Sequence, residues 1–372
     1  MNLTTQNSSF VAVPGQSPEA LSTKPHFDVL DGLRGVAALA IVVFHFMEWV
    51  FTDPKQNFIG HGFLAVDFFF CLSGFVIGYA YDDRIKGMGL RAFFTTRAIR
   101  LHPLVLIGSV LGLLGLLLDP FADHGGLYST GRLLLIFGCS ILMIPFPAMK
   151  DRAYNLFGLN APAWSLFWEY IASIVYALIL SRLPRLALAV VTVLAAVALG
   201  AVAFRAGNLL GGWNGDNFWD GGARLAYSFS AGLLIYRSRW IIRNRLGFGG
   251  LAVLLSLAFV MPFPSWNWLA ELLVVLVYFP LLVALGAGTV LSPRTRKLCV
   301  FSGNISYPLY MTHYWALWIF GNYYTAHKPA GGELALLIVG GTLFLVGFAW
   351  LVMTLYDTPV RRYLSRRRGR RV

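Results

Sequence analysis

One apolar stretch near the start of the chain carries two side chains that are costly to bury in lipid. Arg34 lies near the beginning of residues 29–50, and His45 lies well inside them. On an α-helix this separation spans about three turns and roughly 16 Å, so both side chains fall on nearly the same face. Burial in a bilayer is costly for ionisable groups unless they face a polar interior, so both are functional candidates. The alternative is that Arg34 extends to lipid headgroups and His45 is a packing residue.

Further polar residues accompany these two. Glu48 follows His45 by three residues on an adjacent helical face, where it either orients the imidazole or marks the end of the helix. The next apolar run contains Asp67 and Ser73 among aromatic residues. A carboxylate within a span needs a partner. We expect that partner to be His45 or an incoming hydroxyl, because Arg34 lies toward the other membrane surface.

Two more pairs and a second histidine follow. Arg97 and Arg100 share one helical face, and paired guanidiniums suit bidentate binding of phosphate, although cytoplasmic loops are rich in arginine without any such function. Ser165 and Glu169 lie one turn apart, which predicts that Ser165 caps a helix and that Glu169 is buried one turn deeper. His313 is a second histidine within an apolar run.

The composition indicates which elements position these side chains. Of 372 residues, 57% are hydrophobic and only 13% are charged, which predicts an all-α integral membrane protein. The net charge of +13 comes from short basic clusters between apolar runs, so we expect no nucleic-acid partner. The three cysteines lack CxxC spacing, which favours neither disulfides nor a metal site. Motifs of soluble hydrolases and NTPases are absent, which excludes those classes.

The apolar runs predict about ten transmembrane helices, because a hydrocarbon core of about 30 Å takes about 20 helical residues. The expected spans lie near residues 30–50, 62–81, 100–118, 164–180, 186–204, 223–236, 247–264, 268–287, 300–320 and 334–356. Residues 132–146 are apolar but short, and we interpret them as a re-entrant or interfacial helix. Counting them as a full crossing would invert every later loop.

The basic residues predict the orientation. Loops on one side of the predicted membrane carry 21 Lys and Arg residues and those on the other side carry 7. Basic loops stay in the cytoplasm, so both termini are expected there and the protein in the inner (plasma) membrane. Residues 1–27 are expected to be a flexible cytoplasmic tail, 28–360 the transmembrane domain, and 361–372 a basic cytoplasmic tail.

One predicted external loop has a distinctive composition. Residues 205–222 are rich in Gly, Asn, Asp and Trp, a mixture that favours turns and stacking contacts with carbohydrate. The alternative is that Trp213 and Trp219 belong to the aromatic belt at the membrane surface.

Five segments in this order resemble the membrane-bound acyltransferase family 3. They are LDGLRGVAALAIVVFHF, GFLAVDFFFCLSGFVI, RAIRLHPL, APAWSLFWEYIASIVY and NISYPLYMTHYW, and the resemblance covers about residues 28–362. The chain departs from the family pattern at Tyr170, where a second acid usually follows, and at Asp357, where Glu usually precedes a proline. These departures bear on the substrate more than on the reaction.

The resemblance implies transfer of an acyl group, usually acetyl, from acyl-CoA in the cytoplasm to a hydroxyl of an envelope or exported carbohydrate. It implies that His45 is the catalytic histidine with Arg34 as its partner, and that Arg97 and Arg100 contact the CoA phosphates. No metal is implied. Supporting or substrate-binding roles then remain for the other polar residues, namely Glu48, Asp67, Ser73, Ser165, Glu169 and His313. We expect no appended esterase-like domain after the last span.

Two alternatives use the same buried groups. A transporter or flippase for a glycan or a lipid-linked sugar would need intramembrane charges for a proton-coupled pathway. An unrelated family of membrane-bound O-acyltransferases also uses an intramembrane histidine, and membership of it would place catalysis at His313. Within the main hypothesis, His45 is either a general base or the first acceptor of the acyl group.

Overall fold

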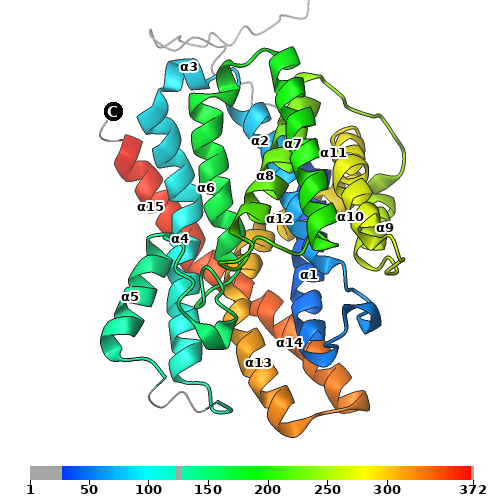
Figure 1. Ribbon diagram of the computed structural model, residues 1–372. Coiled ribbons are helices and arrows are strands. Elements are labelled where there is room, and N and C mark those ends of the chain that lie inside the picture. The colour runs from blue at the N-terminus through cyan, green and yellow to red at the C-terminus, as the bar shows by residue number, and fades with distance from the viewer. Residues whose placement is uncertain (1–26, 123–126, 370–372) are drawn as a thin grey trace, which may run out of the picture.

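The computed structural model describes residues 27–122 and 127–369, and these residues form α-helices and short helical turns without a β-strand. The all-α expectation is therefore confirmed for this part of the chain (Figure 1). The predicted flexible tail falls on residues 1–27, of which 1–26 lie outside the described residues.

The helices follow one another with short connections. They are α1 (Asp28–Val50), α2 (Ala65–Tyr81), α3 (Ile85–Met88), α4 (Leu90–Leu117), α5 (Thr130–Ile141), α6 (Ala163–Leu178), α7 (Arg185–Ala206), α8 (Phe218–Arg237), α9 (Gly247–Phe259), α10 (Asn267–Leu273), α11 (Phe279–Ala287), α12 (Pro293–Thr312), α13 (Tyr314–His327), α14 (Gly331–Val352) and α15 (Thr358–Gly369). Single π-helical turns, Val274–Tyr278 and Met353–Asp357, join α10 to α11 and α14 to α15.

Seven helical stretches among the described residues are long and apolar enough to cross a membrane. They are Asp28–Val50, Gly62–Tyr81, Leu90–Leu117, Ala163–Arg182, Arg185–Ala206, Asn267–Ala287 and Gly331–Arg368. The other three expected spans correspond to α8, to α9 with its 13 residues, and to α12 with α13. The protein is thus a multi-pass helical membrane protein, while ten crossings and cytoplasmic termini stay predictions.

Helix α1 lies inside the bundle and contacts α2, α9, α11, α12, α13 and α14. The pair α2 and α8 is also closely packed, and glycines make this approach possible. A Cβ atom on Gly74 would lie 2.0 Å from the carbonyl oxygen of Phe229, and one on Gly232 would lie 1.8 Å from that of Cys71. The small-residue face of the second span therefore serves helix packing.

The expected continuous span at 300–320 is interrupted. Helix α12 ends at Thr312 and α13 begins at Tyr314, so His313 lies at the junction between them. The hydroxyl of Thr312 donates to the carbonyl of Pro308, and the His313 ring bonds to the carbonyl of Leu309.

Two other expectations change at the helix ends. The short apolar segment predicted at 132–146 is the 12-residue helix α5, which ends at Ile141 and packs against α4. Whether it crosses the membrane stays a prediction. The basic segment expected as a tail from residue 361 continues the last helix as far as Gly369, and residues 370–372 lie outside the described part.

Candidate active site

Two of the predicted site residues, His45 and Glu48, line one cavity. Its volume is about 350 Å³, and its lining comes from α1, α2, α6, α8, α12, α13 and the segments that connect them. Its polar and aromatic lining includes His45, Glu48, Trp49, Arg152, Trp164, Trp213, Tyr310 and Trp318. We call it the His45 cavity.

His45 is held by Glu48. Its Nδ1 atom lies 2.5 Å from a carboxylate oxygen of Glu48, and the two side chains are 27% and 43% exposed. A carboxylate only accepts hydrogen bonds, so we assign the ring proton to Nδ1, which leaves the lone pair on Nε2. The orienting interaction predicted from the i,i+3 spacing is therefore present.

His313 stacks beside His45. The ring centroids are 5.6 Å apart with an interplanar angle of 24°. Nδ1 of His313 donates to the carbonyl of Leu309 over 3.0 Å, and its Nε2 is buried without a hydrogen-bond partner among the described residues. Such an acceptor costs about 1–3 kcal/mol when left unpaired, and buried exceptions of this kind often mark functional positions.

A loop residue that the sequence analysis treated only as a topology signal also enters this cavity. The guanidinium carbon of Arg152 lies 3.6 Å from the ring centroid of Trp318, and Asp151 is 3.5 Å from its Nε. Burial lowers the pKa of Arg152 from its ordinary value, and the Asp151 carboxylate opposes that shift. Nothing in the sequence around Arg152 signals this placement, because the contact depends on α13, more than 160 residues away.

The expected partner of Asp67 was wrong. Both carboxylate oxygens of Asp67 accept hydrogen bonds from Arg224, at 3.0 and 2.6 Å, and both side chains are buried. Arg224 was counted as a loop residue, but it lies in the second turn of α8, which the glycine contacts bring against α2. Asp67 therefore joins two helices and does not contact His45 in any described interaction.

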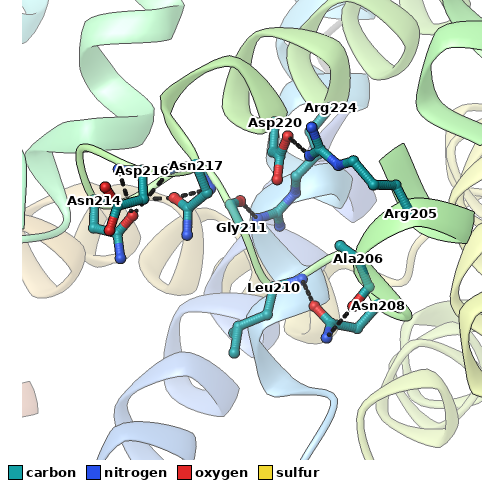
Figure 2. A network of polar contacts seen from close by, with 11 residues as sticks. Arg205, Ala206, Asn208, Leu210, Gly211, Asn214, Asp216, Asn217, Asp220 and Arg224 are labelled. Atoms are coloured by element: carbon teal, nitrogen blue, oxygen red, sulfur yellow. Dashed lines mark hydrogen bonds and ion pairs between the residues drawn. The ribbon is translucent and has the colours of Figure 1, made fainter. Parts of the chain in front are cut away.

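The loop expected at residues 205–222 is shorter in the structure, because residues 205–206 end α7 and residues 218–222 begin α8. Arg224 fixes the remaining 207–217 loop beside the cavity. Figure 2 shows Arg224 bonded to the carbonyl of Gly211, over 2.8 Å. In the same view Asn214 and Asn217 accept hydrogen bonds from loop backbone N–H groups. These turns place Trp213 in the cavity lining, whereas Trp219 is 76% exposed and lies outside it.

Ser165 also has a different role from the one expected. Helix α6 starts at Ala163, and no side chain caps it. The hydroxyl of Ser165 donates to the carbonyl of Pro162 over 3.1 Å and lies 2.7 Å from the hydroxyl of Tyr310. Since Tyr310 lines the His45 cavity, Ser165 positions a cavity residue.

A second group of predicted residues meets between α2, α4 and α6. One carboxylate oxygen of Glu169 lies 2.5 Å from a guanidinium nitrogen of Arg97 and 3.1 Å from the hydroxyl of Ser73. Nε of Arg97 donates to Ser173 over 3.1 Å, and the Arg97 side chain is only 4% exposed. Glu169 thus has its buried partner, and Arg97 is occupied by protein groups.

Arg34 joins α1 to α12. Its Nε donates to Ser306 over 2.8 Å, its Nη2 donates to the carbonyl of Gly303 over 2.7 Å, and Asp31 lies 3.0 Å away. The described contacts of Arg34 are therefore with these residues and not with His45. Arg100 lies one helical turn after Arg97 on α4 and is exposed.

The fold and the site together define a polytopic helical membrane protein with a carboxylate-held histidine in a cavity rich in tryptophan. Residues 27–354 match the family model described as an acyltransferase domain, so the chain belongs to the acyltransferase-3 family. Family membership excludes the unrelated membrane-bound O-acyltransferase family considered above. No solved structure matches the chain.

The sequence relatives agree with this assignment. Protein 2 in the picA locus of Rhizobium radiobacter is 37% identical over 42% of this chain and 83% of that protein. Acyltransferase MdmB of Streptomyces mycarofaciens is 28% identical over 38% of this chain and 36% of its own length. A Staphylococcus aureus protein named "Putative O-acetyltransferase" is 37% identical over 21% of this chain and 12% of that protein. The chain is an O-acyltransferase.

Proposed function

We propose that the protein transfers an acyl group, most often acetyl, from acyl-CoA on the cytoplasmic side to a hydroxyl of an envelope or exported carbohydrate. The observation that carries this proposal is that His45, with Nδ1 bound by Glu48, lines a cavity with four tryptophans. The acyltransferase family supplies the reaction class and favours it over the transporter alternative.

The tautomer of His45 suits general-base catalysis. Its Nε2 would take the proton of the acceptor hydroxyl as that oxygen attacks the thioester carbonyl carbon. The carbon–sulfur bond then breaks, and the thiolate leaves with the proton from the imidazolium. Glu48 would stabilise the positive charge that His45 carries during this step.

An acyl-histidine intermediate is the second form of the same reaction. There Nε2 attacks the thioester carbon itself, CoA thiolate departs, and the acceptor hydroxyl then displaces the imidazole. Incubation with labelled acyl-CoA without acceptor distinguishes the two forms, because only this form leaves label on the protein.

The lining of the cavity favours a sugar ring as the acceptor. Trp49, Trp164, Trp213 and Trp318 offer flat apolar faces from four different segments, and Arg152 adds hydrogen-bond donors. Aromatic faces pack against the C–H faces of sugars, while hydroxyl groups need polar partners.

The test is His45→Ala in the full-length protein, assayed by mass spectrometry of envelope glycans and by label transfer from acetyl-CoA in membranes. A positioned base contributes about 10²–10⁴-fold, so transfer should fall by about that factor while the amount of folded protein is unchanged. Acylation at the wild-type rate would contradict the proposed function.

A further inference from the structure

A second hollow, of about 770 Å³, lies between α4 and the C-terminal helix α15. In Figure 1 α15 continues the line of α14 and lies beside α4, and the two helices are in contact. The Arg368 guanidinium donates a hydrogen bond to the hydroxyl of Thr96, which ties α15 to α4. Five arginines line this α4–α15 hollow, namely Arg100, Arg361, Arg362, Arg366 and Arg368.

The charges in the hollow are far from balanced. Among the described residues that line it, none is acidic. The Asp357 carboxylate, directly before the lining residue Thr358, is buried at the end of the π-helical turn and lies 2.7 Å from Arg361. Like charges one turn apart, as at Arg362 and Arg366, repel each other. A bound anion would remove this repulsion.

The position of the hollow suits a ligand that arrives from water. The helical stretch Gly331–Arg368 has 38 residues, or about 57 Å, which exceeds the hydrocarbon thickness of about 30 Å. Its last part carries the arginines, so these lie in the headgroup or water layer. Arg100, which lines the hollow, lies one helical turn from Arg97 on α4.

The expected pairing of Arg97 with Arg100 for phosphate binding therefore needs revision. Arg97 is buried and bonded to Glu169 and Ser173, so binding phosphate would break an existing ion pair. Arg100, one turn later on α4, lines the hollow instead. Its neighbouring guanidiniums there belong to α15, which the sequence analysis treated as a tail.

We propose that the α4–α15 hollow binds the phosphate groups of the acyl donor through Arg100, Arg362 and Arg366, and that Arg97 serves the fold. This inference rests on the proposed function for the identity of the donor. Guanidinium groups bind phosphate oxygens bidentately. A donor with a diphosphate and a separate phosphomonoester, as in CoA, presents anionic groups to arginines from two helices. An anionic lipid headgroup offers the same chemistry.

The experiment uses full-length protein in nanodiscs of zwitterionic lipid and measures both CoA binding and acyl transfer. In the double variant Arg362→Gln/Arg366→Gln, the Kd for CoA and the KM for acyl-CoA should rise about tenfold to a hundredfold. The kcat at saturating donor should stay within about twofold, because neither arginine acts on the reacting atoms. The matched control Arg243→Gln/Arg245→Gln removes two exposed charges from the α8–α9 loop and should change neither constant.

The arms of this experiment separate the possible failures. An unchanged Kd for CoA in the double variant would overturn the proposal. The proposal would also be overturned if phosphatidylglycerol in the nanodiscs stabilised the wild type but not the double variant, while both proteins bound CoA equally. The site would then hold a lipid headgroup. His45→Ala should bind CoA like the wild type. CoA binding that depends on the α15 arginines without any acyl transfer would support the site and contradict the proposed function instead.

Discussion

At the scale of single residues, the proposed chemistry depends on which ring nitrogen of His45 is free. The Glu48 carboxylate binds Nδ1, so the group that can accept a proton is Nε2. The pair is partly exposed in a cavity, which gives an acceptor access to the base. Glu48 is thus a positioning residue that acts through His45.

We predict that Glu48→Gln lowers kcat about 10- to 100-fold, because the neutral amide stabilises the imidazolium less than a carboxylate does. The KM for acyl-CoA should be unchanged, and kinetics in membranes check both constants. Glu333→Gln is the matched control, since this exposed glutamate bonds to Tyr323 and lies outside the His45 cavity. Equal rates for Glu48→Gln and the control would remove Glu48 from the mechanism.

The buried ring of His313 predicts a different effect. It stacks on His45 and lies outside the lining of the His45 cavity, so we expect it to position the His45 ring, and His313→Ala should lower kcat/KM for the acceptor about 5- to 100-fold. Transfer should remain detectable, unlike in His45→Ala. Measuring the transfer rates of His45→Ala and His313→Ala at saturating acyl-CoA checks this prediction. Complete loss of transfer in His313→Ala alone would instead assign the base to His313.

At the scale of elements, the cavity depends on the pairing of α2 with α8. Asp67 and Arg224 join these helices, and Arg224 in turn holds the 207–217 loop and so Trp213. We predict that Asp67→Asn lowers the free energy of unfolding by about 3–5 kcal/mol, because it leaves a buried guanidinium without its counter-charge. Thermal unfolding in detergent measures this.

A double-mutant cycle tests the pairing itself. Asp67→Asn combined with Arg224→Gln should be less destabilised than the sum of the single variants, since neither buried charge remains. Asp216→Asn, an exposed position in the same loop, serves as the control and should stay within about 0.5 kcal/mol of the wild type. Strict additivity in the cycle would contradict a direct interaction.

Sequence reasoning predicted the elements better than the contacts between them. Apolar runs predicted helices because burial in lipid requires every backbone group to bond within its own segment. The i,i+3 pair of His45 and Glu48 could also be predicted, since its geometry is local. The contact of Asp67 with Arg224 spans 157 positions, and that of Arg152 with Trp318 joins a loop to a distant helix. Such contacts depend on packing that a local pattern does not encode.

At the scale of the whole molecule, the two proposed sites are built from different helices. Residues of α1, among them His45, line the His45 cavity, whereas the lining of the α4–α15 hollow comes from α4 and α15. Transfer from a cytoplasmic donor to an exported acceptor requires these regions to face opposite sides of the membrane. The orientation therefore decides between transmembrane transfer and transfer on one side.

Cysteine labelling can test this orientation. We predict that Trp219→Cys reacts with a membrane-impermeant maleimide in intact spheroplasts, and that Val290→Cys reacts only after lysis. Both positions are highly exposed, at 76% and 88%, so a difference in labelling reports the side of the membrane and not burial. The natural cysteines Cys71 and Cys299 are buried, and Cys139→Ser removes the partly exposed one.

The same measurement decides the role of α5. If α5 crosses the membrane fully, every later loop changes sides. With a cytoplasmic N-terminus, Trp219→Cys would then react only after lysis, and Val290→Cys would react in intact spheroplasts. A helix of 12 residues is about 18 Å long, well short of a hydrocarbon core of about 30 Å. We therefore expect the first labelling pattern, which places the 207–217 loop and the His45 cavity on the side where an exported carbohydrate would be acylated.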